Sequence, residues 1–176
     1  MVDTTHIVYC RDRGILWGGR AEQPDCKDGS HQHFESQIHR HRTPVLLPDG
    51  SQIVAVSFDP NDPYSREEPP DFGLYLDDRW SPPWPHGHVE WPDYGVPTSS
   101  HELRDKLVHV LDRARCGEHV EMGCLGSHGR TGTALACLAT LGGVPASKAV
   151  AWARSAHCEK AVETPEQAGF VADFGS

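Results

Sequence analysis

Residues 118–141, EHVEMGCLGSHGRTGTALACLATL, change from alternating polar and apolar side chains to a continuous apolar run. Residues 118–122 alternate polar and apolar side chains, as a short strand does. A glycine-rich turn follows, and residues 131–141 are an apolar run of helix-forming residues. The segment therefore predicts a strand, a tight turn and a helix, with the turn directly at the helix N-terminus.

The surrounding sequence predicts the remaining elements. Apolar residues recur at helical spacing after Ser99, and Gly117 marks the end of that helix. Two further helices are predicted, one over residues 146–156 and one that opens with Thr164 and Pro165. Short apolar runs that predict strands lie at residues 15–17, 45–47, 53–56 and 74–76. We expect one α/β domain over residues 1–176, with a central mixed, mostly parallel sheet flanked by helices.

The first half of the chain, residues 1–85, is richer in strands and loops than residues 86–174. All but two of the 14 prolines lie before residue 98. Residues 59–71 and 81–87 carry too many prolines for a helix interior or a central strand, so we expect surface loops there. The charged run at residues 66–71 predicts a hydrated part of the first loop.

Composition and charge limit the function. A length of 176 residues, with 38% hydrophobic and 23% charged residues, is typical of one folded domain. The formal net charge of -9 argues against a stable complex with nucleic acid or anionic lipid. No stretch approaches the roughly 20 apolar residues of a membrane span, so we expect a cytoplasmic protein. The oligomeric state stays open.

The six cysteines lack the Cys-x-x-Cys spacing of common metal and redox motifs. They are Cys10, Cys26, Cys116, Cys124, Cys137 and Cys158. A domain of this size folds without disulfides, so we expect reduced thiols. A reduced thiol in the glycine-rich turn is available for chemistry.

The turn at residues 124–131 has the composition of an anion site. Backbone N–H groups that lead into a helix N-terminus converge on one point, where the helix dipole adds positive potential. The predicted phosphate-binding residues are Leu125, Gly126, Ser127, His128, Gly129, Arg130 and Thr131. The same field stabilises a thiolate, which predicts Cys124 as a nucleophile. Arg130 can hold two phosphate oxygens, and Thr131 can donate its hydroxyl to the sulfur.

A second segment supplies an acid. Displacing phosphate from an ester leaves an oxygen that must be protonated, which requires a positioned proton donor. Residues 91–97, WPDYGVP, place Asp93 in a short loop whose glycine and prolines provide hinges. The ionised form of the same group can take a proton from water in a second step.

These motifs resemble the protein tyrosine and dual-specificity phosphatase superfamily. The resemblance rests on Cys-x5-Arg at 124–130, on Trp-Pro-Asp 31 residues upstream of the cysteine, and on AVETPEQ at 161–167, and it covers residues 87–174. It implies that Cys124 forms a phosphoenzyme, Arg130 binds phosphate, Asp93 is acid and then base, and Gln167 positions the water. It implies a phosphorylated protein or small phosphorylated substrate, and neither cofactor nor metal.

The sequence departs from the family at two loop positions, where Gly123 replaces a usual histidine and Ser127 a usual glycine. A non-catalytic phosphate-binding pseudophosphatase is therefore one alternative function. A phosphatase of phosphoinositides or of RNA or nucleotide 5′-phosphates is another, because His128 favours extra negative charge. No clear counterpart of the loop that grips phosphotyrosine is present, and Tyr64, Tyr75 and Trp84 are candidates to replace it.

Several histidines precede residue 42. His31, His33, His39 and His41, with Cys26 nearby, are residue types that bind zinc. Their spacing matches no familiar structural site, and the interleaved Arg40 and Arg42 would repel a cation. We therefore expect solvated surface histidines and no metal.

Overall fold

The computed structural model describes residues 7–10, 15–18 and 41–175. The chain divides into two units, residues 1–40 and residues 41–176. In the first unit, strand β1 (Ile7–Cys10) pairs with strand β2 (Ile15–Gly18) in an antiparallel hairpin. The prediction of a single domain over all 176 residues stays a prediction. The histidines at 31, 33 and 39, and Cys26, lie outside the described residues.

The second unit contains a five-stranded sheet in the order β3-β4-β7-β5-β6. The strands are β3 (Arg42–Leu46), β4 (Gln52–Ser57), β5 (Phe72–Tyr75), β6 (His86–His88) and β7 (Val120–Cys124). β3 pairs antiparallel with β4, and the other three pairings are parallel. The predicted mixed, mostly parallel sheet is therefore confirmed. Pro44 is tolerated in β3 because this strand lies at the sheet edge.

Two of the described strands, β1 and β6, were missed by the sequence analysis. β6 begins inside residues 81–87, which the prolines predicted to be a loop, and it pairs with β5 from Gly73↔His86 to Tyr75↔His88. A strand of three residues at a sheet edge needs no strong local sequence pattern, because its conformation is stabilised by pairing with β5.

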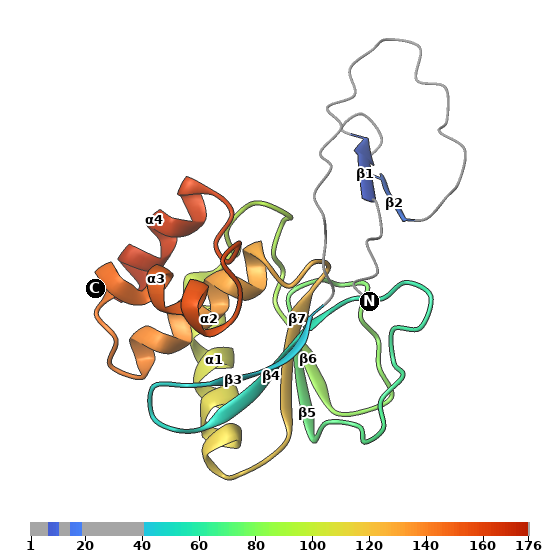
Figure 1. The fold of residues 1–176 in the computed structure, drawn as a ribbon, viewed down its shortest axis with the longest axis horizontal. Coiled ribbons are helices and arrows are strands. Elements are labelled where there is room, and N and C mark those ends of the chain that lie inside the picture. Colours follow the sequence, from blue (N-terminus) through green and yellow to red (C-terminus); the bar gives the residue numbers. More distant parts are fainter. Residues whose placement is uncertain (1–6, 11–14, 19–40, 176) are drawn as a thin grey trace. The chain divides into compact units, whose positions relative to one another are not determined.

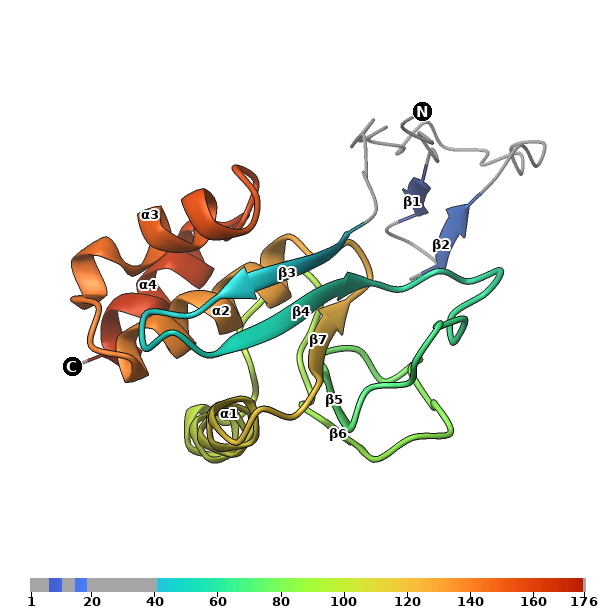
Figure 2. The ribbon, with the colours of Figure 1, turned by 60° about the horizontal axis from the view of Figure 1, so that its bottom comes forward.

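Four helices complete this unit. They are α1 (Ser100–Arg115), α2 (Gly129–Leu141), α3 (Ala146–Ala156) and α4 (Pro165–Phe174). Ser99 Oγ accepts a hydrogen bond from the Glu102 N–H and begins α1. Thr164 and Gln167 form a capping box at the start of α4. Figures 1 and 2 show the helices gathered on one side of the sheet.

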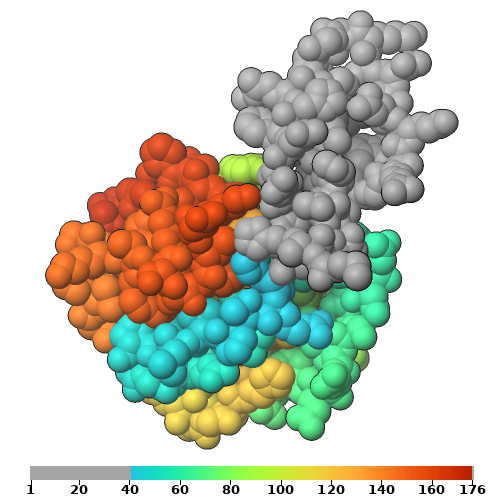
Figure 3. Space-filling model, viewed as in Figure 1, coloured from blue at the N-terminus to red at the C-terminus, as the bar shows by residue number. Residues whose placement is uncertain are grey.

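Alternation along the strands separates two apolar layers. Ile53, Leu74 and Met122 face the helices and belong to the main core. Their neighbours Val56 and Tyr75 face the opposite side, where Trp80 and Trp84 cover the sheet. The helical layer also meets the turn after β3, because Pro48 lies against Gly142 at the end of α2. Figure 3 shows these two segments meeting, in turquoise and orange.

A buried charge pair anchors the loop between β4 and β5. The guanidinium of Arg66 binds the carboxylate of Glu121 through Nε–Oε2 at 2.9 Å and Nη2–Oε1 at 3.0 Å. The hydroxyl of Tyr75 donates to the same carboxylate, and the indole of Trp84 donates to Tyr75. The prediction of a hydrated loop is wrong at Arg66, whose side chain is 5% exposed. Because Tyr75 and Trp84 are buried in this cluster, neither can grip an incoming substrate.

The parallel strands bring several chain segments to one edge of the sheet. Cys124 pairs with Ser57, and Gly123 pairs with Tyr75, at the carboxyl ends of these strands. Ligands of open α/β sheets bind at this edge. In the described part of the chain, no helix has the length and apolarity needed to cross a lipid bilayer.

Candidate active site

The loop between β7 and α2 carries the predicted nucleophile at its start. Cys124 is the last residue of β7, and four residues separate it from the first residue of α2. The Thr131 hydroxyl donates to Cys124 Sγ at 3.1 Å, which is the hydrogen bond that the sequence predicted. Sγ therefore lies at the amino end of a 13-residue helix, where the backbone field favours a negative charge.

Arg130 connects the phosphate loop, residues 124–131, to two neighbouring segments. Its Nη1 donates to the carbonyl oxygens of Leu76, at 3.0 Å, and of Trp91, at 3.3 Å. Its Nη2 lies 3.0 Å from Asp77 Oδ2 and 3.2 Å from Asp93 Oδ1. Two sequence motifs 31 residues apart are thus joined through one guanidinium.

The third nitrogen of this guanidinium lacks an internal partner. Arg130 Nε is buried and has no acceptor among the described residues. A buried donor of this kind calls for a partner such as a bound anion. Burial alone lowers the pKa of Arg130, but the negative charges of Cys124, Asp93 and Asp77 outweigh burial and raise it. The guanidinium therefore remains cationic at every relevant pH.

Asp77 was missed by the sequence analysis. It lies at the carboxyl end of β5, is buried, and accepts hydrogen bonds from Arg79 and Arg130. Burial raises the pKa of Asp77. The hydrogen bonds from Arg79 and the charge of Arg130 lower it by more, so the pKa falls below the ordinary 3.8. An aspartate directly after the apolar run at 74–76, at a parallel-strand end, was the available signal.

In the Trp-Pro-Asp loop, the Trp91 side chain is buried and fixed by a hydrogen bond, whereas the Asp93 side chain is partly exposed. The indole of Trp91 donates to the carbonyl oxygen of Gly95 at 2.8 Å, and the ring is buried. The Asp93 side chain is 37% exposed and contacts Arg130 through Oδ1. A carboxyl group in this position lies within reach of both the phosphate loop and an external molecule.

Gln167 is committed to structural hydrogen bonds. Its Oε1 accepts from the backbone N–H groups of Glu163 and Thr164, and its Nε2 donates to Gly95 O at 3.1 Å. The amide therefore ties α4 to the Trp-Pro-Asp loop. The predicted role of Gln167 in positioning water stays a prediction.

Glu163 adds a second carboxylate that the sequence analysis did not predict. Its side chain lies against the backbone of Gly129, at the first residue of α2. Partial desolvation, and next the nearby charge of Asp93, raise the pKa of Glu163 above its ordinary 4.5. The backbone N–H of Gly129, at the start of α2, favours the carboxylate anion but does not offset burial and the charge of Asp93.

The structure explains one departure from the family pattern, at Gly123, and shows that the other, at Ser127, places a serine in strained backbone. A β-carbon at Gly123 would lie 2.4 Å from the carbonyl oxygen of Val56, so the close pairing of β4 and β7 leaves no room for a side chain. Ser127 adopts φ = 58°, a left-handed conformation that favours glycine. His157 contacts the Ser127 carbonyl oxygen through Nε2 at 2.6 Å and stabilises this backbone.

Backbone strain is concentrated around this site. Within the described residues, the non-glycine residues with positive φ are Tyr94, Ser127 and Val162. Tyr94 belongs to the Trp-Pro-Asp loop, Ser127 to the phosphate loop, and Val162 to the segment that packs on Gly132 of α2. Strained backbone of this kind clusters at active and binding sites.

Two proteins of Methanocaldococcus jannaschii are similar to this chain in sequence. The uncharacterized protein MJECL20 is 37% identical over 112 residues, which are 57% of this chain and 74% of that protein. The uncharacterized protein MJ0215 is 34% identical over 126 residues, which are 65% of this chain and 77% of that protein. The chain belongs to the family of these two archaeal proteins. No family model matches the chain.

Solved structures identify the fold. Tk-PTP in its active form has a TM-score of 0.59 and 21% identity, and the match covers 74% of this chain and 95% of that one. Kinase associated phosphatase gives a TM-score of 0.61 at 13% identity, covering 78% and 93%. The Trypanosoma brucei protein tyrosine phosphatase TbPTP1 gives 0.61 at 16%, covering 76% and 71%. The chain therefore has the fold of protein tyrosine and dual-specificity phosphatases, as the motifs predicted.

Proposed function

We propose that this protein is a cysteine-dependent phosphatase that hydrolyses phosphate monoesters of the phosphotyrosine or dual-specificity class. The observation that carries the proposal is the placement of Arg130. Its guanidinium contacts Asp93 at 3.2 Å, its charge interacts with Cys124, and its Nε lacks an acceptor among the described residues. A phosphate group would satisfy that donor and bring the reacting atoms together.

The proposed reaction has two steps. In the first, the Cys124 thiolate forms a bond to phosphorus, the bond to the ester oxygen breaks, and Asp93 donates a proton to the leaving oxygen. In the second, a water oxygen attacks phosphorus, the S–P bond breaks, and Asp93 takes the water proton. The N–H groups of the phosphate loop and Arg130 stabilise the equatorial oxygens in both steps.

The test uses an aryl phosphate substrate and vanadate as a phosphate analogue. Cys124→Ser removes the nucleophilic sulfur and is expected to abolish turnover while vanadate binding persists. Cys116→Ser is the matched control, because Cys116 is an exposed free cysteine after α1. Its turnover is expected to equal that of the wild type. Retained turnover in the Cys124→Ser protein would overturn the proposal.

A second experiment separates catalysis from simple phosphate binding. Rapid mixing of the wild type with radiolabelled substrate, followed by acid quenching, is expected to trap a phosphorylated protein. Cys124→Ser is expected to trap none. Binding of vanadate without turnover or trapped phosphate in the wild type would instead identify a pseudophosphatase.

A further inference from the structure

Three side chains with metal-binding atoms meet beside the phosphate loop. His41 directly precedes β3, His128 caps α2, and Cys158 follows the end of α3. One ligand atom of each residue lies within 4.8 Å of the ligand atoms of the other two. All three residues are buried. The prediction of solvated surface histidines is therefore wrong for His41.

The distances suit a tetrahedral zinc ion. Nε2 of His41 lies 3.0 Å from Nε2 of His128. Two imidazole nitrogens on one tetrahedral zinc lie about 3.3 Å apart, and a thiolate sulfur lies about 3.5 Å from each nitrogen. Small side-chain movements would bring the three atoms from their present spacing to those values.

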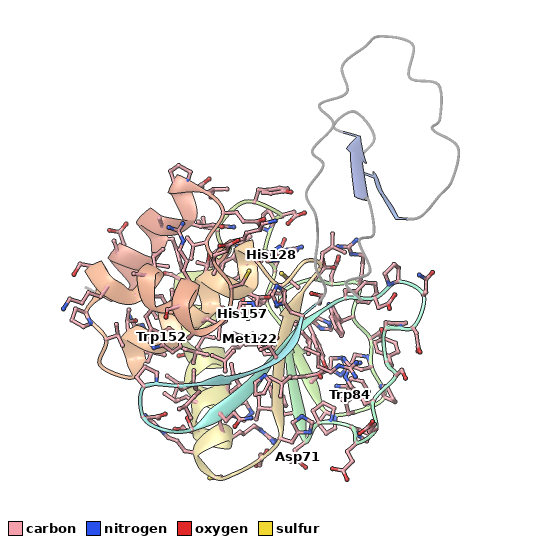
Figure 4. All side chains as sticks on the ribbon, viewed as in Figure 1. Asp71, Trp84, Met122, His128, Trp152 and His157 are labelled. Atoms are coloured by element: carbon pink, nitrogen blue, oxygen red, sulfur yellow. The ribbon has the colours of Figure 1, made fainter. Side chains whose placement is uncertain are left out.

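Neighbouring groups hold the cluster in place. The ring of His157 packs on His41 with centroids 4.5 Å apart, and its Nε2 contacts the carbonyl oxygen of Ser127. The backbone of His41 is fixed to Ser57 by two hydrogen bonds, both 2.9 Å long. Figure 4 shows His128 and His157 where the helices meet the sheet. Supporting contacts of this kind orient the ligands of a metal site.

We propose that His41, His128 and Cys158 bind a zinc ion. Two imidazoles and one thiolate favour zinc over the hard cations magnesium and calcium, which prefer oxygen ligands. Water or a further donor completes the four ligands. The site is separate from the proposed phosphatase chemistry, because it contains none of Cys124, Arg130 and Asp93. It borders that chemistry through His128, a residue of the phosphate loop.

The test uses the full-length protein, stripped of metal with a chelator under reducing conditions and titrated with Co²⁺ alone. Cobalt bound to a thiolate absorbs in the near ultraviolet, and tetrahedral cobalt absorbs in the visible range. One equivalent of Co²⁺ is expected to saturate both absorptions, and Zn²⁺ is expected to displace it. Cys158→Ser should remove the near-ultraviolet absorption, whereas Cys116→Ser and Cys124→Ser should retain it.

A second variant guards against misfolding of the first. His41→Gln is expected to weaken Co²⁺ binding at least about tenfold and to shift the visible bands. Circular dichroism of the metal-free proteins shows which variants are folded. The proposal fails if the wild type binds no stoichiometric cobalt, or if neither variant changes the spectrum. It also fails if Cys26→Ser, and not Cys158→Ser, removes the thiolate absorption.

Discussion

Asp77→Asn tests whether the buried carboxylate beneath Arg130 stabilises the fold and orients the guanidinium. The variant keeps the size of the side chain and one acceptor oxygen, and it removes the charge. In the wild type, Oδ2 accepts from Arg130 Nη2 at 3.0 Å and Oδ1 accepts from Arg79 Nε at 2.7 Å. An amide nitrogen in place of one oxygen would face one of these donors.

The expected loss follows from the exposure of the two partners. The Arg130 side chain is 5% exposed and that of Arg79 is 41% exposed, so the bond to Arg130 carries most of the effect. Losing one buried, charge-assisted hydrogen bond is expected to lower the free energy of unfolding by about 1.5–3 kcal/mol. A guanidinium that is less well held should also bind vanadate about tenfold more weakly, equivalent to about 1.4 kcal/mol.

The pH dependence has a defined sign. The pKa of Asp77 is lower in the folded protein than its ordinary 3.8. Its contribution to stability is therefore present above that value and is lost as pH falls through the lower, folded value. The difference between the wild type and Asp77→Asn should shrink below pH 3.8.

Urea unfolding followed by circular dichroism, at neutral and at acid pH, measures both quantities. Asp78→Asn is the matched control, because Asp78 is the adjacent residue and is exposed. Its stability and vanadate affinity are expected to equal those of the wild type. A stability difference for Asp77→Asn that is absent at neutral pH, or that does not change with pH, would refute the reasoning.

Four other substitutions have expected outcomes. Asp93→Ala should lower turnover by about 10²–10⁴, and less for aryl esters with good leaving groups; an equal effect on both ester types would exclude Asp93 as the acid. Ser127→Gly relieves a positive φ, so the melting temperature should rise about 2–4 °C; an unchanged or lower value contradicts this. Glu163→Gln should stabilise the protein at neutral pH, because the pKa of Glu163 is raised in the folded protein and the stability of the wild type falls as this group ionises. The advantage of the variant should disappear below pH 4.5, where the wild-type group is protonated. Thermal unfolding at the two pH values measures the difference. Glu121→Ala leaves Arg66 buried and unpaired and should cost about 3–5 kcal/mol in urea unfolding; a loss under about 1 kcal/mol would show that the pair is dispensable.

Sequence reasoning found the parts of the site that are encoded locally. Cys124, Arg130 and Thr131 lie in one turn, so their common surroundings follow from spacing alone. The four helices were predicted from local signals: helical apolar spacing and a cap in α1, an apolar run of helix formers in α2, and start signals before α3 and α4. Strand β6 and the buried state of Arg66 depend on partners far along the chain, which no local pattern reveals.

The remaining site residues needed the sheet topology. Asp77 follows β5 at the edge where the parallel strands β4, β5 and β7 end, and His41 precedes β3, whose antiparallel pairing with β4 brings its start to the same edge. Cys158 follows a different helix and was indistinguishable in sequence from any other isolated thiol. Strand pairing brings such residues together from distant segments of the chain, so their spacing in the sequence does not predict that they lie close together.

The proposed zinc site and the phosphate loop share a short piece of backbone, so we expect zinc binding and phosphate binding to be coupled. His128 belongs to the metal cluster through its ring, while its backbone starts α2 and leads directly to Arg130. Ser57 bonds to His41 and donates to the carbonyl oxygen of Gly126. A zinc ion that fixes the rings of His41 and His128 would therefore restrain the phosphate loop from two sides. Coupling requires that zinc binding favours one of two loop states over the other. Because the positive φ of Ser127 is strained, we expect the phosphate loop to relax to a second state when no ion is bound.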